Sequence, residues 1–367
     1  MRGVTPLHGP EFSTFSPDAV TWLLDDLSDL ALEAPVDERE KRKALGLQHY
    51  SDDLPIELPT TESFMAVFQS ALPSLATSAA SMVQKVALDL AARGRSRLAL
   101  VSLARAGVPP ATWLKESLAV NYGQASSHYA VSIVKDLGLD QRAIEYVLSR
   151  HDPEDVFFVD GWTGSGAIRS ELSHSLQAMG ADMVLDRLVV LCDPAGVADV
   201  YGSQYDELLP SACLNATSCG LVSRTVTVRT SAGGVRHGAK FYQDRITEDM
   251  TRVIHEHVSL KLLAASRSPD SEEQPDLSAK SHITSAIRER LEAPSVSVKW
   301  GFGESMRALQ RRQPTLLVVD PAQLKRAASR PLMALATERG VPVRTLPISP
   351  YGAAALSRTS TDPGRQQ

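Results

Sequence analysis

The sequence predicts an α/β protein whose main domain is a mostly parallel sheet with flanking helices, followed by a small α/β domain. Two observations carry this prediction. Short apolar runs typical of buried strands alternate with helical patterns of about 10–15 residues, an alternation that favours a parallel sheet covered on both faces. A stretch rich in Pro and acidic residues, 268–279, then separates this series from a shorter strand–helix series near the end of the chain.

A chain of 367 residues is long enough for two domains. We divide it into a helical and turn-rich extension packed on the core (1–62), the main α/β domain (63–267), a linker with a bridging helix (268–294) and the small C-terminal domain (295–367). The hydrophobic content of 43% and the charged content of 22% are ordinary for a globular protein.

The sequence also predicts a cytoplasmic protein. No apolar run approaches the roughly 20 residues that a membrane span needs, and the first 16 residues lack the apolar core of a signal peptide. Three cysteines, at 192, 213 and 219, are an odd number without zinc-site spacing, which favours reduced thiols. The sequence does not determine the oligomeric state, and a homodimer is one possibility.

The N-terminal third reads as mainly helical. Ser16-Pro17-Asp18 is typical of a helix start, and an apolar stripe continues it to Leu30. Residues 38–43 form a charged, exposed segment. Thr60 or Thr61 is expected to cap a long helix from Glu62 to about Arg93, interrupted near Pro73.

Four strands and their helices then follow in order. We expect strands at 97–103, 129–134, 155–160 and 188–191, and helices after Pro109, at 141–150 and at 167–179. A further helix is expected to begin at Arg236 and to run through Met250. A helix at 281–291 is expected to bridge to the C-terminal domain, in which we expect strands at 295–300, 315–320 and 341–344 and helices at 303–312 and 322–339.

Two turns of the main domain have the composition of anion sites. The strand that ends at Asp160 continues into a loop of small and hydroxyl residues, 161–166, and then into a helix. A helix N-terminus presents free N–H groups and a favourable dipole to an anion, and glycines allow a phosphate to approach the backbone. The turn after the strand at 97–103 contains Arg105 and Gly107 in the same strand–turn–helix setting.

A third polar stretch, 209–225, is dense in Ser, Asn, Thr, Cys and Arg. Asn215 and Ser218 could hydrogen-bond a base-like or ribose-like group, and Arg224 could pair with a phosphate or a carboxylate. The alternative is that these side chains only satisfy backbone groups in a turn.

The strand, Asp160, the hydroxyl loop and the helix resemble the phosphoribosyl-diphosphate (PRPP) loop of type I phosphoribosyltransferases. Ser102 to Gly107 resembles their pyrophosphate loop. The resemblance implies that Asp160 holds the ribose hydroxyls and that Arg105 faces the diphosphate, which Mg²⁺ accompanies. It implies a substrate-binding set of Ser102, Ala106, Gly107, Gly161, Trp162, Thr163, Gly164, Ser165 and Gly166. The sequence departs from the family pattern at Gly161, where a second acid is usual, and at Gly164, where a hydroxyl is usual.

A wider resemblance spans nearly the whole chain. The segments at 50–55, 129–133, 160–166, 191–196 and 210–225 occur in this order in the StiP-type phosphoribosyltransferase-like family of tellurium-resistance and stress operons, also labelled cysteine protease StiP. That family carries a C-terminal Pelota-like RNA-binding domain. The resemblance implies an enzyme of nucleotide metabolism that binds PRPP or another nucleotide-like molecule, with RNA as a partner of its last domain.

The charge distribution agrees with such a partner. Residues 295–367 contain 11 Lys and Arg against 4 Asp and Glu, whereas the rest of the chain has an excess of acidic residues. The turn at 301–304 matches the family's glycine-containing RNA-contact turn. The expected RNA-binding residues are Lys299, Gly301, Gly303, Arg307, Arg311 and Arg312, through phosphate contacts.

Two other functions stay open. The missing second acid at Gly161 and the basic C-terminal domain favour a non-catalytic nucleotide- or RNA-binding regulator. A cysteine protease would need Cys213 or Cys219 near His237, with Cys219 expected to be the more exposed thiol. No metal site is expected from the sequence, because His255 and His257 point to different sides of a helix.

Overall fold

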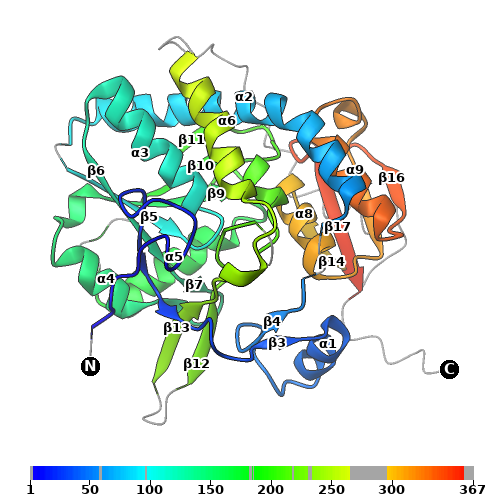
Figure 1. The fold of residues 1–367 in the computed structure, drawn as a ribbon, viewed down its shortest axis with the longest axis horizontal. Coiled ribbons are helices and arrows are strands. Elements are labelled where there is room, and N and C mark those ends of the chain that lie inside the picture. Colours follow the sequence, from blue (N-terminus) through cyan, green and yellow to red (C-terminus); the bar gives the residue numbers. More distant parts are fainter. Residues whose placement is uncertain are drawn as a thin grey trace.

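The computed structural model describes residues 3–57, 60–95, 97–181, 184, 186–216, 219–229, 234–264 and 296–358. A six-stranded sheet lies at the centre of the main domain (Figure 1), and every neighbouring pair of its strands is parallel. Its order is β1 (Thr21–Leu23), β6 (Ser126–Val131), β5 (Leu98–Leu103), β9 (Val156–Trp162), β10 (Leu188–Cys192) and β11 (Val200–Ser203). The predicted α/β class with a parallel sheet is confirmed.

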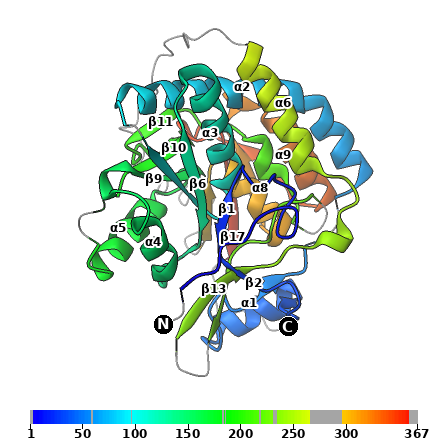
Figure 2. The ribbon, with the colours of Figure 1, turned by 60° about the vertical axis from the view of Figure 1, so that its left-hand side comes forward.

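Helices cover both faces of this sheet (Figure 2). The first face packs against α2 (Glu62–Ala92), α3 (Val108–Tyr122) and α6 (Met250–Ala264), and the second against α4 (Gln141–Leu148) and α5 (Ala167–Ala178). Successive residues of one strand serve opposite faces: Leu98 and Leu100 belong to the first core, Ala99 and Val101 to the second. Because both faces are buried, the strands read as continuous apolar runs.

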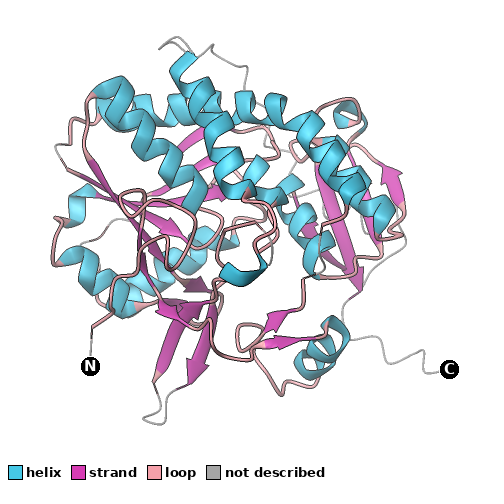
Figure 3. Cartoon of the chain, viewed as in Figure 1, coloured by secondary structure: helices cyan, strands magenta, loops and turns pink. Residues whose placement is uncertain are grey.

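The C-terminal domain is a small α/β unit on one side of the main sheet (Figure 3). Its four strands have the order β14 (Val296–Trp300), β17 (Ala353–Arg358), β15 (Leu316–Val319) and β16 (Val343–Thr345), and its helices are α8 (Phe302–Arg311) and α9 (Ser329–Glu338). Phe302, Met306 and Leu332 lie in the same hydrophobic cluster as Phe64 and Phe68 of α2. The two units therefore share one continuous core.

Smaller elements complete the fold. They are β2 (Asp25–Asp26), β3 (Glu33–Ala34), α1 (Val36–Ala44), β4 (Leu54–Pro55), β7 (Ile133–Val134), β8 (Gly138–Leu139), β12 (Val226–Arg229) and β13 (Val235–Ala239). Short 3₁₀ turns lie at Pro153–Asp155, Pro210–Cys213, Gln243–Arg245 and Pro321–Gln323. No helix of the described residues has the length and apolarity to cross a membrane.

Two predicted helices are wrong. Residues 16–30 form β1 and β2, because β1 completes the edge of the main sheet by pairing with β6 and buries Trp22, whose indole N–H donates to Ser13 Oγ. Residues 235–239 form β13, which pairs antiparallel with β12. The helix expected there begins only at Met250.

Other boundaries differ for local reasons. Thr61 caps α2 as expected, accepting from the Phe64 N–H at 3.2 Å, but Pro73 does not interrupt the helix. Pro73 lies on the exposed side, where water can satisfy the carbonyl that loses its partner. The charged segment at 38–43 is part of α1, and the helix expected at 322–339 begins at Ser329. The predicted linker at 268–294, with its helix at 281–291, lies outside the described residues.

Acid is expected to destabilise the fold through His128. Its ring is buried between the Ala19 carbonyl, 2.9 Å from Nδ1, and Ser102 Oγ, 2.8 Å from Nε2, and burial lowers the pKa of His128 to about 3. The unfolded chain takes up a proton near pH 6.5 and the folded chain does not, so stability falls as the pH drops through 6.5. At pH 5 we expect His128 by itself to subtract about 2 kcal/mol from the free energy of unfolding. Burial raises the pKa of Asp206 to about 7 and that of Asp160 to about 6, and these two groups act in the opposite direction.

Urea unfolding at pH 7 and pH 5 measures this loss. Between pH 7 and pH 5, His128→Gln should lose about 2 kcal/mol less stability than the wild type, whatever its own cost at pH 7, whereas substitution of the exposed His174 should leave the wild-type change intact. Equal slopes of stability against pH in the wild type and in His128→Gln would contradict the assignment.

Candidate functional site

The central strand β9 ends in the loop that the sequence singles out. Asp160 lies near its carboxyl end, and the loop leads through Gly166, with φ of +87°, into α5. A cavity of about 250 Å³ opens at this point. It is lined from the main domain by Tyr50, Ile133, Lys135, Asp160, Trp162, Gly164, Ser165, Ala167, Ile168 and Glu171, and from the C-terminal domain by Val298, Lys299, Trp300, Glu304 and Arg307.

Thr163 does not face this cavity. Its side chain is fully buried, and its hydroxyl donates to Asp193 Oδ1 at 2.7 Å. The Thr163 hydroxyl oxygen also accepts from the Ala195 N–H. The expectation that this hydroxyl cradles a phosphate is therefore corrected: Thr163 fixes the loop to the turn after β10. Gly164 and Ser165 are the loop residues that line the cavity.

Two glycines let the two predicted loops approach each other. A Cβ on Gly161 would lie 3.2 Å from the Ala106 carbonyl oxygen, and one on Gly107 would lie 2.0 Å from the Val159 carbonyl oxygen. A larger residue at 161, such as the acid usual in phosphoribosyltransferases, would press on the turn that contains Ala106. The Ala106 carbonyl and the Leu209 side chain would have to move by a few tenths of an ångström to admit it.

The turn at 102–107 is buried more deeply than expected. The Ser102 hydroxyl donates to the Tyr129 carbonyl at 3.2 Å and is fully buried. The Arg105 guanidinium donates to the carbonyls of Val222 at 2.9 Å and Leu214 at 2.8 Å, and the Ala104–Arg105 peptide bond is cis. Arg105 therefore ties the turn to 214–222, which corrects the expectation that it faces a diphosphate.

The polar stretch at 209–225 divides between two places. Asn215 is buried and lines a separate cavity with Thr60, Met65 and Cys219, so it does not join the loop of Asp160. Arg224 donates to the backbone carbonyls of Tyr50, Asp53 and Thr225 and lines a second cavity beside the first. Ser218 lies outside the described residues.

The turn expected to contact RNA packs against the main domain. A Cβ on Gly301 would lie 3.1 Å from Asp206 Oδ1, and one on Gly303 would lie 2.2 Å from Trp162 Cε2. Lys299, Arg307, Arg311 and Arg312 also line the cavity between the two domains. In this arrangement these residues form a wall of the candidate site, and Gly301, Phe302 and Gly303 of the turn are buried. RNA contact by this turn stays a prediction.

Asp206 joins the two domains directly. Its carboxylate accepts from the backbone N–H of Phe302, at 2.9 Å to one oxygen, and from that of Gly352 at 2.8 Å. Burial raises the pKa of Asp206 to about 7, and the N–H groups of Gly352 and Phe302 oppose this rise. The contact places the first turn of α8 over the loop of Asp160, and the Tyr351 hydroxyl adds a 2.9 Å bond to the Gly164 carbonyl.

Charged groups of both domains meet above Asp160. Arg307 stacks on Trp162, with its guanidinium carbon 4.5 Å from the ring centroid, and donates to Glu304 at 3.0 Å. Burial raises the pKa of Asp160 to about 6, while the Arg307 charge and the Gly161 N–H act against it. Burial alone would raise the pKa of Glu304 as well, but Arg307 and Lys299 hold it below its usual value.

Sequence reasoning missed several residues of this site. Tyr50 borders both cavities, and Arg39 belongs to a segment that reads only as charged and exposed. Glu57 accepts from Arg311 Nε at 2.9 Å and from the Ala216 N–H at 2.9 Å. Of Tyr50, Arg39 and Glu57, Tyr50 alone carries a sequence signal, because it begins the Tyr50–Pro55 segment of the family pattern.

The three thiols are buried and protonated. Cys192, Cys213 and Cys219 are each 3% exposed or less, so the expectation that Cys219 is the more exposed one is wrong. Burial raises the pKa of Cys219 to about 11 and that of Cys213 further. His237, the expected base, is buried and bonds to Ser132 Oγ through Nδ1 at 2.9 Å. A thiolate nucleophile has no support in this arrangement.

We therefore expect the native protein to resist iodoacetamide at pH 8. Mass spectrometry should find no alkylated cysteine without denaturant and three in denaturant, because the thiolate is the reactive form. Rapid alkylation of Cys213 or Cys219 in the folded protein, with loss of an activity, would restore a protease to consideration.

Comparisons with known proteins agree on the family. Residues 13–259 match a family described as "Tellurite-like stress resistance cysteine protease StiP", and residues 279–359 match the PELOTA RNA binding domain. A protein of Acinetobacter baylyi (strain ATCC 33305 / BD413 / ADP1), named "Cysteine protease StiP", is 29% identical over 352 residues, which cover 88% of each chain.

Among solved structures, the chain is similar to the hypoxanthine phosphoribosyltransferase of Trypanosoma cruzi. The identity is 16%, the TM-score is 0.26, and the match covers 36% of this chain and 77% of the other. A second structure, a glutamine mutant from a study of an invariant aspartic acid in HPRTs, has the same identity and TM-score over 36% and 76% of the two chains. Since the family match spans well over half of the sequence, this chain belongs to the StiP family.

Proposed function

We propose that this chain is a phosphoribosyltransferase-like enzyme that binds PRPP, or a related nucleotide containing ribose 5-phosphate, in the cavity at the end of β9. One observation carries the proposal: Asp160 and the loop residues Gly164 and Ser165 line the same cavity, at the N-terminus of α5. In open α/β sheets, ligands bind at the carboxyl ends of the strands. The stress setting in the family's description is the biological context that we propose for it.

The cavity offers a distinct partner to each part of a ribose 5-phosphate. The backbone N–H groups at the start of α5 and the exposed Ser165 hydroxyl suit the 5′-phosphate, because the helix dipole favours an anion there. The Asp160 carboxylate suits the two ribose hydroxyls as an acceptor. Lys135 adds positive charge to the same wall.

The proposed reaction transfers the phosphoribosyl group to an acceptor with a free lone pair. That lone pair forms a bond to C1′ of PRPP, while the bond from C1′ to the diphosphate oxygen breaks and its electron pair leaves with diphosphate. The acceptor's proton passes to solvent. Positioning and charge stabilisation then supply most of the rate, because the transition state resembles a ribosyl cation.

The donor set fits Mg²⁺ bound together with a diphosphate. The described residues contain no group of three or more His, Cys, Asp or Glu side chains that could hold a metal alone. Asp160 and Glu304 nevertheless line one cavity, and Mg²⁺ commonly binds one or two carboxylates plus substrate phosphates. When bound, Mg²⁺ would neutralise charge on the leaving diphosphate. Asp160 and Glu304 would hold it.

Calorimetric titration with PRPP tests the proposal. We expect saturable binding that weakens when Mg²⁺ is omitted, and that weakens at least about tenfold in Asp160→Ala, because a charged hydrogen bond contributes about 1.5–3 kcal/mol. Asp155→Ala is the matched control, since Asp155 precedes the opposite end of the same strand. Absent binding, or equal affinities in the two variants, would sink the assignment.

A second candidate is a nucleotide-binding regulator without turnover. Gly161, at the position of the family's second acid, favours it, since one ribose contact is lacking. Release of diphosphate from bound PRPP, measured with a panel of nucleobases as acceptors, separates the two. Tight PRPP binding with no diphosphate release would favour the regulator.

A further inference from the structure

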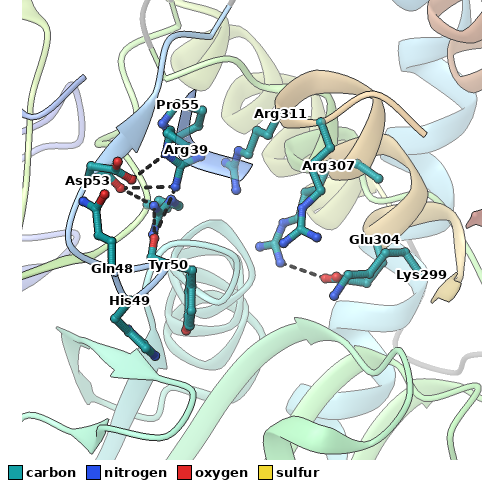
Figure 4. A pocket seen from close by; sticks show the side chains of 13 residues that line it. Arg39, Gln48, His49, Tyr50, Asp53, Pro55, Lys299, Glu304, Arg307 and Arg311 are labelled. Atoms are coloured by element: carbon teal, nitrogen blue, oxygen red, sulfur yellow. Dashed lines mark hydrogen bonds and ion pairs between the residues drawn. The ribbon is translucent and has the colours of Figure 1, made fainter. Parts of the chain in front are cut away.

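A second cavity of about 180 Å³ adjoins the first, and the two share Tyr50, Lys299, Glu304 and Arg307 as lining residues. Figure 4 shows Arg307 and Arg311 on one wall and Arg39 and Tyr50 on the opposite one. Six cationic side chains line this second cavity, Arg39, Arg224, Lys299, Arg307, Arg311 and Arg312, against the two carboxylates of Asp53 and Glu304. Four positive charges are therefore in excess at its wall.

One nitrogen of the Arg311 guanidinium, Nη2, makes no hydrogen bond within the described residues. The Nε of Arg311 bonds to Glu57, but Nη2 is buried. Burial lowers the pKa of Arg311 to about 9, with Glu57 acting against that effect. A buried donor without a partner costs about 1–3 kcal/mol. Because Nη2 itself is covered, an anion in the cavity would pair with the charge of the guanidinium and would bond to Nη2 only after that group turns toward the cavity.

The turn at 102–107 cannot take that anion here. Arg105 and Ala106 border a gap of only about 10 Å³, which Trp162 and Arg307 close, and this is room for about one water molecule. The Arg105 guanidinium is engaged with two backbone carbonyls. Lys135, Lys299 and Arg307 line the cavity of Asp160, and Lys299 and Arg307 continue into the second cavity.

We infer that the second cavity is a diphosphate-binding subsite, built by Arg307, Arg311 and Arg312 of the C-terminal domain. Arg39 and Arg224 add positive charge to the opposite wall, although Arg39 is paired with Asp53 and Arg224 bonds to backbone carbonyls. The inference rests on the proposed function in one respect, since it takes the diphosphate to be that of PRPP bound at Asp160. Its chemistry is that of a multiply charged phosphate anion held by several guanidinium groups. The C-terminal domain thereby becomes part of the substrate site.

Matched ligands test the subsite in the full-length protein. PRPP and ribose 5-phosphate differ by the diphosphate, so the ratio of their affinities by calorimetry measures what the subsite contributes. We expect a ratio of at least about a hundredfold in the wild type and a loss of about tenfold of it in Arg311→Met. Arg312→Met, which does not touch the Glu57 pair, should have a similar effect if Arg311→Met folds poorly. Arg330→Met is the control, since Arg330 is exposed on α9.

The outcomes separate this inference from the proposed function. If both arginine variants bind PRPP and ribose 5-phosphate with the wild-type ratio of affinities, the subsite is overturned and the proposed function still stands. If the protein binds inorganic pyrophosphate in an Arg312-dependent manner but binds neither sugar phosphate, the subsite is supported and the proposed function is refuted. A single-stranded RNA oligonucleotide whose binding needs Arg312, with no change in the PRPP ratio, would overturn the subsite in favour of RNA.

Discussion

Glu57→Ala is expected to lower the free energy of unfolding by about 3–5 kcal/mol. The Glu57 carboxylate is buried and bonds to Arg311 Nε and to the Ala216 N–H. Burial alone would raise the pKa of Glu57, but Arg311 and Arg105 hold it below its usual value, so the group is ionised at neutral pH. Its removal leaves the Arg311 charge and a backbone donor without partners in a poorly solvated place.

Urea unfolding of two further variants makes this measurement specific. Glu57→Ala combined with Arg311→Met should recover part of the loss, because no unpaired charge remains. Glu256→Ala breaks a surface ion pair between Glu256 and Arg252, whose side chains are 55% and 65% exposed, respectively. This change should lower the free energy of unfolding by no more than about 0.5 kcal/mol. Equal losses in Glu57→Ala and Glu256→Ala would contradict the expected role.

Gly303→Ala is expected to destabilise the protein by about 1–3 kcal/mol. Gly303 is in the first turn of α8, where alanine would ordinarily favour the helix. Here the new Cβ would lie 2.2 Å from Trp162 Cε2, and that ring is fixed beneath Arg307. Either α8 or the ring must shift, which displaces Arg307 and weakens PRPP binding as well.

Thermal unfolding and PRPP titration of one protein sample measure both effects. Gly3→Ala is the control, since nothing lies within 4 Å of the added carbon. A raised melting temperature in Gly303→Ala would show that helix propensity outweighs the contact, and that the two domains pack less tightly than described.

Elements buried on both sides could be predicted from the sequence. Val156 to Val159 and Leu188 to Leu191 are continuous apolar runs because helices cover both faces of their sheet. β17 could not be predicted, since Ala353-Ala354-Ala355 has low strand propensity. These small side chains lie at the middle of the C-terminal sheet, where β14 and β15 flank them. Tertiary packing overrides local preference there.

The candidate site was predictable only in part. The loop around Asp160 could be placed because a strand, a small-residue turn and a helix leave a local signature. The direction in which a side chain points leaves no such signature in the sequence. Arg105 and Thr163 are residue types suited to binding an anion, yet Arg105 donates to backbone carbonyls and Thr163 donates to Asp193. The wall formed by α8 depends on how two domains pack, and only contacts such as that of Asp206 determine it.

The shared core has a practical consequence for dissecting the protein. Phe302, Met306 and Leu309 belong to one hydrophobic cluster with α2. A fragment beginning at residue 296 would expose these side chains to water, and such fragments tend to self-associate. The remaining fragment would lose the cover over Trp162. RNA-binding and ligand-binding assays on the two fragments would therefore report on newly exposed apolar surfaces. Point substitutions in the intact chain avoid this problem.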